Sequence, residues 1–128
     1  MSHSHAVVWI DHHTAQVLHF DAAHVQAQKV KARTDHTRQH HSGVRTEHEF
    51  FGEVCDALAG VPEVLMTGSH TAQADFRRYV EKHRSALGPQ IVGWETVDHP
   101  TEGQLLALAR QYFLKHDRLT GNAPIIRV

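Results

Sequence analysis

The sequence predicts a single α/β domain in which an antiparallel meander of three strands is followed by a βαβα segment. The chain has 128 residues, the usual length of one domain, and apolar residues make up 41% of it. Three short β-forming runs open the chain, and two further strand-like runs are each followed by apolar residues at helical spacing. This order of elements indicates one mixed sheet with helices packed on it.

The first third of the chain contains the three predicted strands of the meander. The first two runs are strongly apolar and are separated by four polar residues, as in a β-hairpin. The third run mixes apolar and polar positions, which is typical of an exposed or edge strand. These strands cover residues 6–10, 15–20 and 25–30.

Capping boxes indicate where two of the three predicted helices begin. Thr46 is followed by Glu49, and Thr101 by Gln104, each pair just before an apolar helical pattern. Two β-α units imply parallel strands joined by right-handed crossovers. The predicted helices run from Thr46 to Gly60, over 72–83 and from Thr101 to 116, with strands at 63–67 and 90–95.

We place the domain at residues 1–117 and a tail at residues 118–128, in which Ile125 and Ile126 could form a short edge strand. No apolar run approaches the ~20 residues that span a bilayer, so no membrane partner is expected. The first residues do not resemble a secretion signal, and we therefore expect a cytoplasmic protein. The single cysteine, Cys55, excludes a disulfide framework and a cysteine-rich zinc cage, and it falls on the apolar side of a predicted helix.

A basic, histidine-rich loop is predicted at residues 33–48, because the apolar signal vanishes after the third strand. Long loops inside a compact domain tend to be functional or disordered. Between Lys29 and His48 there are five Lys or Arg residues against two acidic ones. Such loops suit contacts with phosphate backbones. The residues predicted to contact RNA are Lys31, Arg33, Arg38, His40, His41 and Arg45.

The histidines of this loop leave a second hypothesis open, a metal- or pH-responsive regulatory module. Histidine changes charge near neutral pH and is a frequent zinc ligand. His36 and His40 would lie one turn apart on a helix, and His41 and His48 are close in sequence. The predicted metal ligands are therefore His36, His40, His41 and His48, with zinc as the ion.

Asp98 and His99 are a further candidate, because they lie between a predicted strand and a helix N-terminus. Ligands of α/β sheets, and anions in particular, often bind at that place. The same residues could equally shape the entry into the helix. No nucleophile elbow, Walker loop, dinucleotide fingerprint or zinc-protease motif occurs in the sequence, so it gives no sign of catalysis.

Three segments together resemble the small bacterial proteins labelled translational machinery proteins. These proteins are related to the middle domain of archaeal and eukaryotic class I release factors and of Pelota. The segments are 6–20 with Trp-Ile-Asp-His, 63–79 with Leu-Met-Thr-Gly-Ser, and 92–113 with Gly-Trp-Glu-Thr-Val-Asp-His-Pro-Thr-Glu-Gly-Gln. The resemblance implies a domain fold of the release-factor type.

The resemblance also bears on function. In release factors the middle domain carries a Gly-Gly-Gln motif in a basic loop before a long helix, and the motif promotes release of the nascent chain on the ribosome. The corresponding residues here, 40–44, read His-His-Ser-Gly-Val and contain no glutamine. The resemblance therefore implies a non-catalytic protein that binds the ribosome or tRNA, with no DNA partner.

Overall fold

The computed structural model describes residues 4–32 and 42–120. The predicted meander is confirmed. Strands β1 (His5–Ile10), β2 (Thr14–Phe20) and β3 (Val25–Lys31) pair antiparallel, with Val8 opposite Val17 and Val17 opposite Gln28. The mixed polarity of the third strand reflects its place at one edge of the sheet, where Val30 is its one buried residue.

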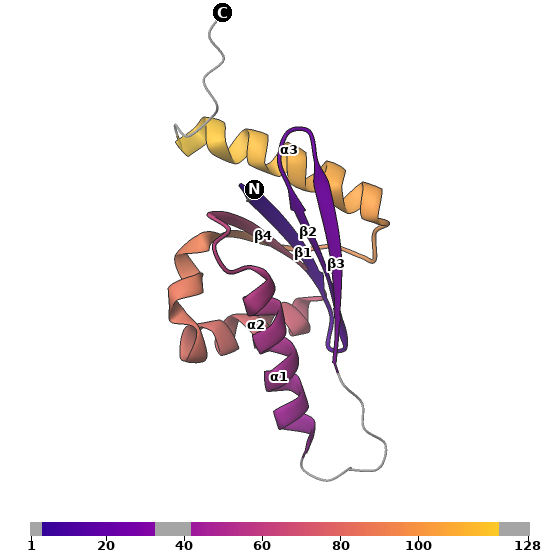
Figure 1. Ribbon diagram of the computed structural model, residues 1–128, viewed down its shortest axis with the longest axis vertical. Coiled ribbons are helices and arrows are strands. Elements are labelled where there is room, and N and C mark those ends of the chain that lie inside the picture. Colours follow the sequence, from indigo (N-terminus) through magenta and orange to yellow (C-terminus); the bar gives the residue numbers. More distant parts are fainter. Residues whose placement is uncertain (1–3, 33–41, 121–128) are drawn as a thin grey trace, which may run out of the picture.

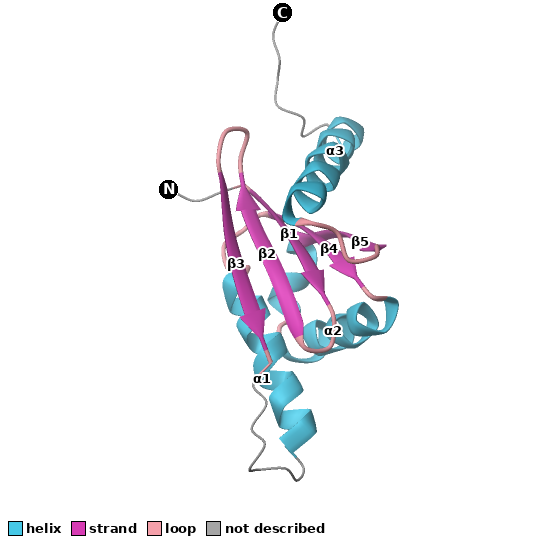
Figure 2. Cartoon of the chain, turned by 90° about the vertical axis from the view of Figure 1, so that its right-hand side faces the viewer, coloured by secondary structure: helices cyan, strands magenta, loops and turns pink. Residues whose placement is uncertain are grey.

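The two predicted β-α units complete the sheet on the other side of β1. Strand β4 (Glu63–Gly68) runs parallel to β1, and β5 (Ile91–Thr96) runs parallel to β4. The order across the sheet is β3-β2-β1-β4-β5 (Figure 2). The structure thus confirms the predicted mixed α/β fold.

Three long helices cover the sheet on both faces (Figure 1). Helices α1 (Ser42–Ala57) and α2 (His70–His83) pack on one face, and α3 (Glu102–Thr120) packs on the other. Alternate residues of each strand point to opposite faces, so Val8 and Val7 belong to different cores. The largest side chains of the two cores are Phe50, Phe51 and Phe76 on the first face, and Trp9, Phe20 and Phe113 on the second.

The start of α1 differs from the prediction, since the helix begins at Ser42 and Thr46 lies inside it. The prediction of a loop up to residue 48 was therefore wrong for residues 42–48. Extending a helix costs little once its core-facing residues are anchored, because nucleation is the unfavourable step. The buried residues Phe50 and Phe51 supply that anchor, and the local capping signal does not decide the boundary.

Two smaller differences concern the second half of the chain. A 3₁₀ segment, η1 (Ser85–Gln90), precedes β5 and buries Leu87, whereas the sequence indicated only a stop at Gly88 and Pro89. Helix α3 continues to Thr120, three residues past the expected end of the domain at residue 117. The expected strand at Ile125 and Ile126 lies outside the described residues. None of the helices in the described part of the chain is long and apolar enough to cross a membrane.

Candidate functional site at the carboxyl rim of the sheet

Four of the five strands end along one rim of the sheet, which we call the carboxyl rim. Strands β1, β3, β4 and β5 point in the same direction, because β2 is antiparallel to both of its neighbours and β4 and β5 continue parallel to β1. The turn after β1, the chain leaving β3, the start of α2 and the turn after β5 all follow these ends. The described candidates Lys31, Asp98 and His99 therefore lie at or just after strand ends on this rim, where ligands of α/β sheets commonly bind.

The turn after β1 is closed by the carboxylate of Asp11. Its Oδ1 accepts hydrogen bonds from the backbone N–H groups of His13 and Thr14, both at 2.7 Å. Burial acts to raise the pKa of Asp11, but these hydrogen bonds outweigh it and leave the pKa below its ordinary value. The ionised carboxylate thus holds the β1–β2 turn in place.

The turn after β5, which contains the predicted ligand residues Asp98 and His99, is fastened to the middle of the sheet by Trp9. The indole Nε1 donates to the carbonyl oxygen of Asp98 at 3.2 Å and is 3.4 Å from that of Val97. The ring of His99 stacks on the indole, with 4.2 Å between centroids and 21° between planes. These contacts support the interpretation that Asp98 and His99 shape the path of the chain into α3. Ligand binding by these two residues stays a prediction.

The entry into α3 confirms the predicted capping box. Thr101 Oγ1 accepts from the backbone N–H of Gln104 at 3.1 Å, and Gln104 Oε1 accepts from the backbone N–H of Thr101 at 2.9 Å. Two of the otherwise unpaired N–H groups of the helix end are satisfied in this way.

The start of α2 carries a buried polar residue, Gln73, that the sequence did not single out. Its Nε2 donates to the carbonyl oxygens of Gly68 and Glu95, at 3.0 and 2.9 Å, and so joins the ends of β4 and β5. Gln73 is 6% exposed, and its Oε1 has no hydrogen-bond partner among the described residues. A glutamine beside apolar helix positions carries no sequence signal for such a role.

Gln73 also lines a cavity of about 300 Å³ between α2 and β5, which we call the α2 pocket. The guanidinium of Arg77 lies over the ring of Trp94, 5.2 Å from its centroid, and forms one side of the pocket. The complete lining is His70, Gln73, Ala74, Arg77, Trp94 and Thr96.

The predicted RNA-binding residues are only partly described. Lys31 is exposed at the end of β3, and Lys29, two residues earlier, is exposed on the same face of the strand. Arg45 lies on α1 rather than in a loop. The remaining predicted residues, Arg33, Arg38, His40 and His41, lie outside the described residues.

Of the four predicted metal ligands, the structure describes only His48, on α1. Its ring lies 5.3 Å from that of Tyr79 and 5.2 Å from that of His83, both on α2. Within residues 4–32 and 42–120, no group of three or more His, Cys, Asp or Glu side chains is placed to hold a metal ion. Zinc binding by His36, His40, His41 and His48 stays a prediction.

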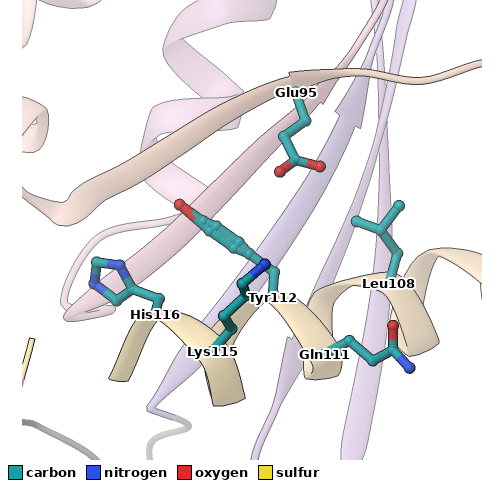
Figure 3. Close-up of a pocket in the computed structure, with 6 residues that line it drawn as sticks. All are labelled: Glu95, Leu108, Gln111, Tyr112, Lys115 and His116. Carbon is teal, nitrogen blue, oxygen red and sulfur yellow. The ribbon is translucent and has the colours of Figure 1, made fainter. Parts of the chain in front are cut away.

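A second cavity, of about 540 Å³, lies between β5 and α3 (Figure 3). The phenol of Tyr112 donates to the carbonyl oxygen of Val92 at 3.1 Å, and its ring occupies the space above Gly93, where a side chain would collide with it. Burial raises the pKa of Tyr112, and Glu95 adds to the shift. A lone glycine within a strand pattern is the sequence signal for such a close approach. The lining residues are Glu95, Leu108, Gln111, Tyr112, Lys115 and His116.

The thiol of Cys55 belongs to the core between α1 and the sheet, where it is 3% exposed. Burial raises its pKa to about 11, so the reactive thiolate is scarce at neutral pH. The structural interpretation of this cysteine is confirmed.

Comparisons with known proteins find similarity in structure alone. No protein-family model matches the chain, and no curated protein matches it in sequence. The Pelota proteins of Thermoplasma acidophilum and Archaeoglobus fulgidus superimpose with TM-scores of 0.59 and 0.60, at 17% and 15% identity. These alignments cover 89% and 91% of this chain but 32% and 35% of the Pelota chains.

An archaeal translation termination factor, aRF1, superimposes with a TM-score of 0.53 at 14% identity, over 91% of this chain and 41% of that one. This chain therefore spans about a third to two fifths of the length of these proteins. Similarity at such low identity shows the fold and not the activity. The expected membership in the bacterial translational machinery proteins stays a prediction. The chain has a fold that is also present in Pelota and in aRF1.

Proposed function

We propose that this chain binds RNA of the translation machinery, on the ribosome or on tRNA, through the cationic segment that runs from Lys29 to Arg45. The observation that carries the proposal is the exposed pair Lys29 and Lys31, on one face of the edge strand β3. The pair immediately precedes Arg33 and Arg38 in the sequence. Exposed cations on a rigid strand are available to phosphate groups, and each neutralised phosphate adds salt-dependent affinity.

Acidic residues near this pair come from α1 and from the start of α3, where Oε1 of Glu102 accepts a hydrogen bond from Gln16, the residue opposite Lys29 on β2. Glu53 and Asp56 line a hollow between β3 and α1 that Lys29 and Lys31 also border. Asp56 pairs with Arg84, whose Nη1 lies 3.0 Å from its Oδ1. Part of the local negative charge is thus already compensated within the protein, which favours an anionic partner for the lysines.

The shared fold and the sequence of residues 40–44 support the rest of the proposal. Pelota and aRF1 contain the same fold, and aRF1 is a translation termination factor. Residues 40–44 lack the glutamine that release factors use, so we propose binding without release of the nascent chain.

Charge reversal in the cationic segment should release the protein from ribosomes. We expect the chain to co-sediment with ribosomes at about 50 mM salt and to dissociate as the salt rises to about 200 mM. The double variants Arg38→Glu with Arg45→Glu, and Lys29→Glu with Lys31→Glu, should each weaken binding by about tenfold or more and flatten the salt dependence.

The matched control is Lys82→Glu with Lys115→Glu, which changes the net charge by the same amount on α2 and α3. It should retain most of the ribosome binding. Equal losses in all three double variants would show a response to net charge alone, and unchanged co-sedimentation of both segment variants would remove the segment from the proposal.

A further inference from the structure

The α2 pocket lies where the connections of the sheet change sides. Strand β4 leads into α2 on one face, and β5 leads into α3 on the other. The ends of β4 and β5 are therefore a topological switch point, and ligands of open α/β sheets bind preferentially at such points. Helix α2 starts with Ser69 as its cap, whose Oγ accepts from the backbone N–H of Ala72 at 3.3 Å.

The unpaired oxygen of Gln73 is an independent sign of a ligand. A buried amide oxygen without a hydrogen bond is costly, and such groups are rare in folded proteins. The orientation of the amide is fixed, because its nitrogen faces two carbonyl oxygens, which accept hydrogen bonds and cannot donate them. This buried oxygen, which belongs to a residue lining the α2 pocket, consequently calls for an N–H or O–H donor.

The other walls suit a planar group with a negative charge at one end. The stacked pair of Arg77 and Trp94 offers a flat cationic surface, and bases stack on Arg and aromatic planes of this kind. His70 lies at the opposite end, beside the N-terminal N–H groups of α2, which favour anions. Arg77 lies seven positions after His70, or about 10 Å along a helix.

Two acidic residues near this pocket are directed elsewhere. Glu95 lines the cavity on the other face of β5, between that strand and α3. Glu81 lies 3.6 Å from Nε of Arg77, one helical turn beyond the pocket in the direction away from His70. No carboxylate is among the described residues that line the α2 pocket.

We propose that the α2 pocket binds a nucleotide, with its base against Arg77 and Trp94, an N–H of the base donating to Oε1 of Gln73, and its phosphate at the start of α2. The pocket of about 300 Å³ is at the lower end of the range for ligand sites, which suits a mononucleotide unit. The oxygen of Gln73 is covered in this structure. Binding therefore requires the side chains that cover this oxygen to shift.

The experiment is an NMR titration of the full chain with uridine and adenosine monophosphates, observed at the tryptophan indoles. The chain has two tryptophans, so the two indole signals report on two separate places. The signal of Trp94 should shift in a saturable way, whereas that of Trp9, which is bonded to Asp98, should stay in place. A short single-stranded oligonucleotide forms a second arm, because a base of RNA and a free nucleotide offer the same chemistry.

Two variants make the test specific. Ala74→Leu fills the pocket from an exposed helix position and should weaken nucleotide binding at least tenfold. Arg77→Ala should weaken it at least fivefold, while Arg78→Ala, whose guanidinium pairs with Asp75 on the side of α1, should not change it. Tighter binding of the oligonucleotide would identify RNA as the source of the base, and equal binding would identify a free nucleotide.

Three results would overturn the inference. The first is a Trp94 signal that does not shift with millimolar mononucleotide or with the oligonucleotide. The second is an equal shift of the Trp94 signal with inorganic phosphate alone. The third is nucleotide binding by Ala74→Leu as tight as that of the unchanged protein. None of these results depends on ribosomes, so this inference and the proposed function fail or stand separately.

Discussion

The substitution Gly68→Ala should destabilise the protein by about 3–5 kcal/mol, which places it among the most damaging single changes. Gly68 ends β4 with a φ of 137°, where side chains are rarely tolerated. A Cβ at this position would collide with the backbone carbonyl oxygen of Ile10 and would lie 2.8 Å from its nitrogen. Since both partners are backbone atoms of paired strands, the clash cannot be relieved by a rotamer change.

Substitutions at two other glycines separate the effect of the positive φ from the effect of the close backbone contact. Gly60 also has a positive φ, 81°, but nothing lies within 4 Å of the point that a Cβ would occupy, so Gly60→Ala should lose only about 1 kcal/mol. Gly103, in the first turn of α3, has neither constraint, and Gly103→Ala should leave the stability unchanged or raise it. Urea unfolding of the three variants measures the order, and a Gly68→Ala variant as stable as Gly60→Ala would contradict the close strand approach.

The substitution Trp9→Ala should have the second large effect, a loss of about 3–5 kcal/mol. Trp9 is 7% exposed and is the largest side chain of the core beneath α3. Its removal leaves a cavity and also frees the turn at Asp98 and His99 from its two hydrogen bonds and its stacking partner.

A milder change, Trp9→Phe, keeps an aromatic ring but removes the N–H, and we expect it to cost about 1–2 kcal/mol. In both variants, backbone amides of the turn at Asp98 should exchange with solvent faster than in the parent protein. Amides of β2 and β3 should exchange only as fast as global unfolding of each variant permits. A Trp9→Ala protein that is destabilised by less than 1 kcal/mol would show that the turn is held by other contacts.

Elements with a strong apolar period could be predicted from the sequence, and boundaries that depend on tertiary anchoring could not. Strands β1 and β2 contribute buried residues to both faces of the sheet, so their apolar runs, uninterrupted from Ala6 to Ile10 in β1, were clear. The predicted capping box at Thr101 forms at the start of α3. The similar pattern at Thr46 lies inside α1, because the helix is anchored by Phe50 and Phe51 and begins before it.

The candidate site could be predicted only where the chain order determines it. Asp98 and His99 were identified from their place between a strand and a helix, and the structure puts them at the carboxyl rim. Gln73 and Arg77 were missed, because their roles arise from carbonyl groups and a tryptophan of β5 that are distant in sequence. The cavity between β5 and α3 was missed for the same reason, although Gly93 carried a local sign of the close approach of Tyr112.

The central claim, that the segment beginning on β3 contacts RNA of the translation machinery, is tested most directly by photo-crosslinking. A photoreactive side chain at position 31, which is exposed, is compared with one at position 114, where Leu114 is 56% exposed on α3. The proposal predicts crosslinks to ribosomal RNA or tRNA from position 31 and few from position 114. Crosslinks from position 114 with none from position 31, or crosslinks to protein alone, would contradict it.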